Sequence, residues 1–193
     1  MNDHNVVYYT NYARLFWDKI NNYFSIQEPE HNYLPIVFEE LPLDERVADT
    51  YGFTHIHIND KTGKASLFPV VFLREDCDQQ QTEETIRHEI IHYYLGLHYV
   101  NHQDNSALFT LMCYLLDGGA YIALDDRRSQ ILEIVKPYAK RIFTKYESSD
   151  DKPNIILHLS LILTAVDDME THADKDLKKL TAVCKICCNK CDC

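Results

Sequence analysis

Residues 85–104 read TIRHEIIHYYLGLHYVNHQD and describe one helix with two different faces. With Ile86 at zero on a helical wheel, the next apolar and aromatic residues fall within about 80° of it, and this forms one apolar face. His88 and His92 fall at roughly 200° and 240°, on the other side of the helix. The pattern predicts a helix that packs one face into a core and presents two imidazoles on the other.

The two histidines are four residues apart, so both imidazoles can reach one cation. Glu89 completes the pattern His-Glu-x-x-His, in which His88 and His92 hold zinc and the glutamate takes a proton from zinc-bound water. Zinc lowers the pKa of that water towards about 7, and the carboxylate can pass the proton to a leaving amine. The sequence therefore predicts a zinc-dependent metallopeptidase with Glu89 as general base. The tyrosines that could stabilise the oxyanion are Tyr93, Tyr94, Tyr99 and Tyr121.

A catalytic zinc site has three protein ligands and one open position, so a third ligand is required. His98 follows His92 by six residues, as in metzincins, but the glycine which that pattern needs is replaced here by Leu95. His102 lies ten residues after the second histidine and reaches the metal if the helix ends before it. A glutamate of a later helix, Glu133, is a further candidate. From the residues alone, these alternatives stay open.

The segment 88–112, HEIIHYYLGLHYVNHQDNSALFTLM, resembles the SprT-like zinc metalloproteases, the zincins that include Spartan. In that family the His-Glu-x-x-His motif is followed, after a variable loop, by a third histidine and then a phenylalanine. His102, with Asp104 and Phe109, takes that place here. Upstream, LFWDKINNYF and LPIVFEEL resemble the opening helix and first strand of the family, and the resemblance covers roughly residues 12–112.

The resemblance implies an α+β, zincin-like fold with an N-terminal helix, a small antiparallel or mixed sheet and the active-site helix, to which the sequence after residue 119 adds C-terminal helices without a counterpart in the family. It implies zinc (Zn²⁺) held by His88, His92 and His102, with Glu89 as general base. Family members cleave proteins, notably proteins crosslinked to DNA, so the expected partner is a protein substrate and DNA is implied as a second one. The formal net charge of −11 argues against DNA binding by the surface as a whole.

Hydrophobic periodicity and turn residues divide the rest of the chain into further elements. The predicted helices cover residues 6–24, about 82–104, 105–116, 127–146 and 153–183, and the predicted strands lie within 33–41, 51–60 and 65–73. The last two strands are expected to form a hairpin, and a substrate strand is expected along the sheet edge near 67–73. Pro137 is expected to kink or divide its helix.

At 193 residues the chain fits one compact domain with an appendage. The expected division is a zincin-like protease domain over 1–119, a helical part over 120–183 packed on it, and a Cys-rich tail over 184–193. Because no basic region leads into an apolar run at the start, no signal peptide is expected. The longest apolar run, residues 155–166, is too short for a membrane span.

The Cys-rich tail, CKICCNKCDC, contains five of the seven cysteines. This clustering differs from the distributed set of a secreted disulfide scaffold, so we expect a reducing, cytoplasmic setting. A frayed reduced tail, a soft-metal site and a redox sensor are the three interpretations of it. The candidate ligands of that second metal site are Cys184, Cys187, Cys191 and Cys193.

Overall fold

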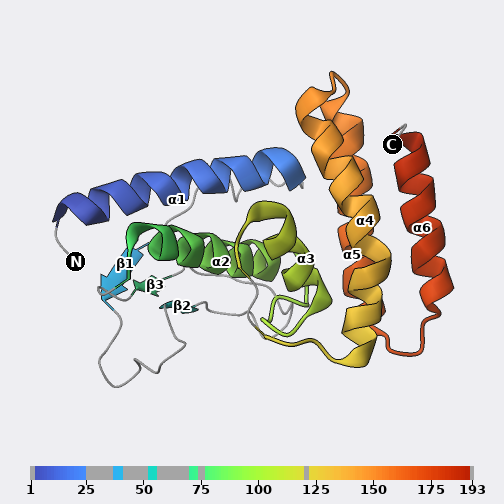
Figure 1. Ribbon diagram of the computed structural model, residues 1–193, viewed down its shortest axis with the longest axis horizontal. Coiled ribbons are helices and arrows are strands. Elements are labelled where there is room, and N and C mark those ends of the chain that lie inside the picture. Colours follow the sequence, from blue (N-terminus) through green and yellow to red (C-terminus); the bar gives the residue numbers. More distant parts are fainter. Residues whose placement is uncertain are drawn as a thin grey trace.

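Helix α2 (Gln79–His98) carries the histidine motif and packs against α1, α3, β2 and β3 in the computed structural model (Figure 1). The structure describes residues 3–24, 37–40, 52–55, 70–73, 77–119 and 122–191. Helix α2 begins earlier than predicted because Asp78 caps it. The Gln81 amide donates to the Asp78 carboxylate at 2.8 Å, and the Gln81 side chain accepts from the Asp78 amide, which completes a capping box.

Five further helices surround or follow α2. They are α1 (Asp3–Phe24), α3 (Ala107–Leu116), α4 (Asp126–Ser148), α5 (Lys152–Thr171) and α6 (Leu177–Lys190). Helix α4 continues through Pro137, which therefore does not divide it. The single helix predicted over 153–183 is wrong, because α5 ends at Thr171 and Asp176 caps a new helix by accepting from the Lys178 amide.

The apolar run 155–166 lies within α5, where its residues alternate between core and surface. None of the helices in the described part of the chain is long and apolar enough to cross a membrane. Helix α5 instead packs against α4 and α6 on one side and against α1 and α3 on another. Figure 1 shows α4, α5 and α6 running side by side at one end of α1 and α2.

Three short strands lie within the predicted strand segments: β1 (Val37–Glu40), β2 (Gly52–His55) and β3 (Val70–Leu73). Their order is β1-β3-β2, with β1 parallel and β2 antiparallel to β3. The substrate edge predicted near residues 67–73 is wrong for β3, because β3 pairs on both sides. In the described sheet, β2 is the edge strand that lies against α2.

The expectation of an α+β, zincin-like fold is wrong for the described chain, which is helical apart from these three four-residue strands. Helix–helix contacts build its core. Among the side chains that the structure describes, Leu73 is the strand residue in that core. The resemblance predicts a sheet as a main part of the fold. In the structure, the apolar residues of α4, α5 and α6 instead pack against one another in a layer of helices.

An aromatic cluster fixes the rotation of α2 about its own axis. The Trp17 ring of α1 packs against the rings of Tyr93 and Tyr94, with centroids 5.5 and 6.0 Å apart. The buried Tyr94 hydroxyl donates to the Phe24 carbonyl at 2.9 Å. Because this face of α2 is held against α1, the opposite face, with the histidines, turns towards the loop between α2 and α3.

Replacing Pro137 by alanine tests whether α4 contains a strained position. Pro137 is exposed, lacks an amide hydrogen and sits in the interior of the helix, so Pro137→Ala restores a backbone hydrogen bond without opening the core. We expect the free energy of unfolding to rise by about 1–3 kcal/mol. Urea denaturation measures it, with the exposed Glu133→Ala, one turn away, as control; an unchanged or lower stability would contradict the expectation.

Candidate metal centre

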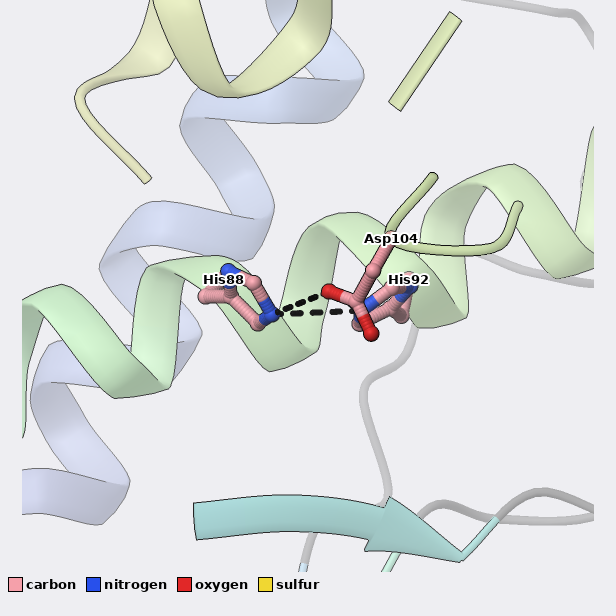
Figure 2. Close-up of side chains that lie close together, drawn as sticks. All are labelled: His88, His92 and Asp104. Atoms are coloured by element: carbon pink, nitrogen blue, oxygen red, sulfur yellow. Dashed lines mark hydrogen bonds and ion pairs between the residues drawn. The ribbon is translucent and has the colours of Figure 1, made fainter. Parts of the chain in front are cut away.

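Three ligand atoms from two segments of the chain converge on one point. The Nε2 atoms of His88 and His92, one turn apart on α2, are 3.2 Å from each other. Asp104, on the loop between α2 and α3, places Oδ1 3.0 Å from the first and 3.2 Å from the second. Figure 2 shows the three side chains converging, with dashed lines from the His88 ring to the Asp104 carboxylate and to the His92 ring. Among the described residues, this is the group of side chains able to hold a metal ion.

Backbone carbonyls set the orientation of both rings. The His88 Nδ1 lies 3.1 Å from the Gly119 oxygen, and the His92 Nδ1 lies 2.5 Å from the His102 oxygen. A carbonyl only accepts, so each Nδ1 carries the hydrogen and each neutral ring presents an Nε2 lone pair to the centre. Histidines that bind metal through one ring nitrogen usually donate a hydrogen bond of this kind from the other. Three lone-pair-bearing atoms so close together repel unless a proton or a cation lies among them.

The spacing of the three atoms fits a tetrahedral ion. Zinc lies about 2.0–2.1 Å from nitrogen and oxygen ligands, which places tetrahedral ligands about 3.3–3.4 Å apart. The observed separations are 3.0–3.2 Å. Two imidazoles and one carboxylate also form a donor set used for zinc and for iron(II). The side-chain exposures of 13, 14 and 42% for His88, His92 and Asp104 leave the carboxylate side open to solvent.

The site is electrostatically coupled. Hydrogen bonds from His88 and His92, which their Nε2 atoms donate when the rings are protonated, hold the pKa of the Asp104 carboxyl well below its usual range. Burial by itself would lower the pKa of His88, but Asp104, the charge of Glu89 and the Gly119 carbonyl outweigh it and raise that pKa above its usual value. In the absence of a metal, the centre therefore favours a proton in the same position.

Phe109 forms the apolar wall of the site. Its fully buried ring stacks on His92, with centroids 3.9 Å apart and planes at 10°, and meets His88 edge to face at 4.8 Å. The ring lies in the first turn of α3, which Ser106 caps by accepting from the Phe109 amide at 2.9 Å. An apolar shell of this kind restricts solvent and holds the imidazole planes.

Glu89 lies on α2 between the two histidines and is only 4% exposed. Its negative charge acts on the centre, since it contributes to the raised pKa of His88. A buried carboxylate beside a group of metal ligands is a candidate proton acceptor. The role that the His-Glu-x-x-His pattern predicts for Glu89 stays a prediction.

The structure does not bring His102, the expected third ligand, into the group. Its Nδ1 donates to the Val100 carbonyl at 2.9 Å, and its Nε2 lies 3.3 Å from the Gln103 amide nitrogen. The backbone oxygen of His102 orients His92, and Asp104 supplies the third ligand atom instead. The alternative ligand His98 stacks near Tyr94, with centroids 4.6 Å apart. The third candidate, Glu133, is exposed on α4.

Two of the tyrosines considered for the oxyanion are engaged away from the site. Tyr94 donates to the Phe24 carbonyl, and the Tyr99 hydroxyl interacts with Thr164 of α5. The buried Tyr93 ring packs on α1. Tyr121 lies outside the described residues.

The described cysteines of the predicted tail lie on α6 and at its end. Cys184, Cys187, Cys188 and Cys191 are all buried, on the side where α6 meets α4 and α5. Burial raises the pKa of the Cys184 thiol to about 12, and the same cause raises that of Cys187. In the described part of the chain they form no group with metal-binding spacing, and Cys193 lies outside it. These thiols therefore pack as small apolar side chains.

Comparison of the chain with models of protein families, with curated proteins and with solved structures gave no match. The resemblance to SprT-like proteases thus rests on the quoted motifs. Sequence reasoning missed Asp104 as a ligand, although it lies two residues after His102. The usable signal was its carboxylate on a short loop directly after the histidine helix.

Removing the Asp104 carboxylate tests the ligand assignment. In Asp104→Ala we expect zinc affinity to fall by more than the roughly 10–100-fold typical of outer-shell changes. In His102→Ala the loss should stay below about tenfold, because the group that orients His92 is a backbone carbonyl. Competition with a chromogenic chelator measures both. Loss of zinc in His102→Ala with full retention in Asp104→Ala would reverse the assignment.

The raised pKa of His88 predicts opposite pH trends with and without metal. Its contribution to the stability of the metal-free protein is fully present below about pH 6.5 and is lost as the pH rises through the raised value. Zinc binding needs the deprotonated ring and therefore improves over the same range. Between about pH 6 and 8 we expect the Tm of the metal-free protein to fall relative to His88→Gln, while the zinc-induced rise in Tm grows. Parallel trends would contradict this.

Proposed function

We propose that this chain is a zinc-dependent hydrolase of peptide bonds. The observation that carries the proposal is the convergence of His88 Nε2, His92 Nε2 and Asp104 Oδ1 within 3.2 Å of one another. The buried Glu89 follows the first ligand directly in the chain. This combination supports the proposal, because metal-assisted hydrolysis requires metal ligands and a proton acceptor close together.

When bound, the metal supplies Lewis acidity that polarises a carbonyl and makes water easier to deprotonate. The ligand residues keep their geometry through Gly119, His102 and Phe109, so little reorganisation is needed. Glu89 accepts a proton from the attacking water as its oxygen bonds to the carbonyl carbon. The carbon–nitrogen bond then breaks, and Glu89 passes that proton to the leaving nitrogen, which gives a carboxylic acid and an amine; a further proton transfer between these two products leaves a carboxylate and an ammonium group.

The described sheet offers a place for the substrate chain. Among the strands that the structure describes, β2 pairs with β3 on one side only, and it lies against α2. An extended peptide that adds to this edge gains backbone hydrogen bonds without needing a particular side chain. A protein segment in extended conformation is therefore the substrate that we propose, in agreement with the protein substrates implied by the SprT-like motif. DNA is not part of the proposal, because the formal net charge is −11.

The donor set alone also suits iron(II) chemistry, since two histidines and one carboxylate bind both metals. Glu89 favours hydrolysis, because the pattern His-Glu-x-x-His supplies the proton acceptor that such a reaction uses. Metal analysis of the purified protein distinguishes the two. A zinc content near one ion per chain supports the hydrolase. Iron together with oxygen-dependent turnover would contradict the hydrolase and favour an iron-dependent oxygenase.

Glu89→Gln separates catalysis from metal binding. The amide keeps the size of the side chain but cannot accept the proton, so we expect zinc content to stay unchanged while cleavage of an unfolded protein falls by at least about 100-fold. Fragment release on gels, with zinc measured on the same sample, gives both quantities. Asp168→Asn, an acidic residue exposed on α5 and paired with Lys175, serves as control. Equal cleavage by wild type and Glu89→Gln would exclude the proposed role.

A further inference from the structure

We propose that Asp167 and Glu170 of α5 are positioning residues for the metal centre, because they hold the two ends of the loop that carries Asp104. The proposal rests on the proposed metal site and extends it to a helix more than sixty residues away in the chain. It also gives the C-terminal helices a part in the chemistry, since α5 packs against α4 and α6.

Asp167 holds the beginning of the loop. Its Oδ1 accepts from the Asn101 amide at 2.9 Å and from the Asn101 side chain at 2.8 Å. The Asn101 side chain also donates to the Asp167 backbone carbonyl at 3.0 Å and to the Thr171 hydroxyl at 3.1 Å. One residue of the loop thus makes four hydrogen bonds to α5, and this fixes both its backbone and its side chain.

Glu170 holds the end of the loop, one turn further along α5. Its side chain is fully buried and accepts from the amides of Ala107 and Leu108 at 2.8 and 3.0 Å. These are first-turn amides of α3, which have no partner inside the helix. Arg128 of α4 donates to Glu170 at 3.2 Å and balances the charge. Three helices therefore meet at this carboxylate.

The groups that the loop and the start of α3 contribute to the site lie between these two anchors or just after them. The loop carries the Asp104 carboxylate and the His102 carbonyl that orients His92, and Phe109 follows the second anchor directly. A shift of either end moves the third ligand and the orienting carbonyl together. Ligand positions must hold within about 0.5 Å for such a site to work, so these anchors control metal geometry.

The Glu170 carboxylate adds to the cap that α3 already has and binds the two first-turn amides that this cap does not reach. Ser106 already caps the helix by accepting from the Phe109 amide. Burial of a carboxylate opposes folding, and burial raises the pKa of Glu170 although the Ala107 and Leu108 amides and Arg128 all donate to it. A bidentate carboxylate adds a fixed position for the end of the loop, which the serine cap by itself does not provide.

Cobalt(II) substitution tests the proposal, because its visible spectrum reports ligand geometry. In full-length Asp167→Ala and Glu170→Gln loaded with cobalt, we expect shifted and weaker bands and a roughly 10–100-fold loss of metal affinity. Asp167→Asn keeps an oxygen acceptor and should recover most of that affinity. The matched control is Asp168→Ala, whose side chain pairs with Lys175 and His172 and does not touch the loop.

Asn101→Ala gives a second route, because it removes the loop side of the contact and leaves α5 unchanged. It should produce the same spectral change even if an α5 variant fails to fold. Lower Tm values with unchanged cobalt spectra and affinities would mean that the anchors serve stability alone, and this would overturn the inference while the metal site stands. A wild-type chain that binds neither cobalt nor zinc would overturn the metal site itself.

Discussion

Two imidazole nitrogens with inward lone pairs lie 3.2 Å apart across one turn of α2, beside a carboxylate oxygen. Such a contact is unfavourable without a proton or a cation between the atoms, and backbone carbonyls prevent the rings from turning away. The rest of the site follows from this constraint. The chain after α2 must return so that the His102 oxygen meets one ring, and the chain after α3 must place the Gly119 oxygen at the other.

Proton and metal compete for the same position. Asp104 favours positive charge at the centre whether it comes from a protonated His88 or from an ion, and its own pKa is held low for that reason. The same arrangement is a hydrogen-bonded group in the metal-free chain, and in the proposed metal-bound chain it would be the ligand set. Phe109 covers one face of the His92 ring and so excludes water from that side in both states. With less water nearby, the electrostatic attraction between the site and a proton or metal ion is stronger.

The sequence was sufficient for α2 and its histidine face, because the period of the apolar residues and the spacing of His88 and His92 are local properties. It was insufficient for the third ligand. Which residue returns to the metal depends on where the loop is anchored, and the anchors Asp167 and Glu170 are distant in the chain. The α+β prediction was wrong for a related reason. Runs of β-branched residues predict strands, but they do not reveal what share of the core will come from helices.

The anchors also couple the site to the C-terminal helices. Helix α5 buries one side among α4 and α6, and its last two turns carry the residues that hold the Asp104 loop. The buried cysteines of α6 lie in that same helical layer, so their packing supports the helix that positions the third ligand. A cavity opened beneath α6 would therefore change metal affinity by displacing α5. A change on the exposed face of α6 would leave metal affinity as it is. The reason is that packed interiors transmit displacements, whereas solvated surfaces absorb them.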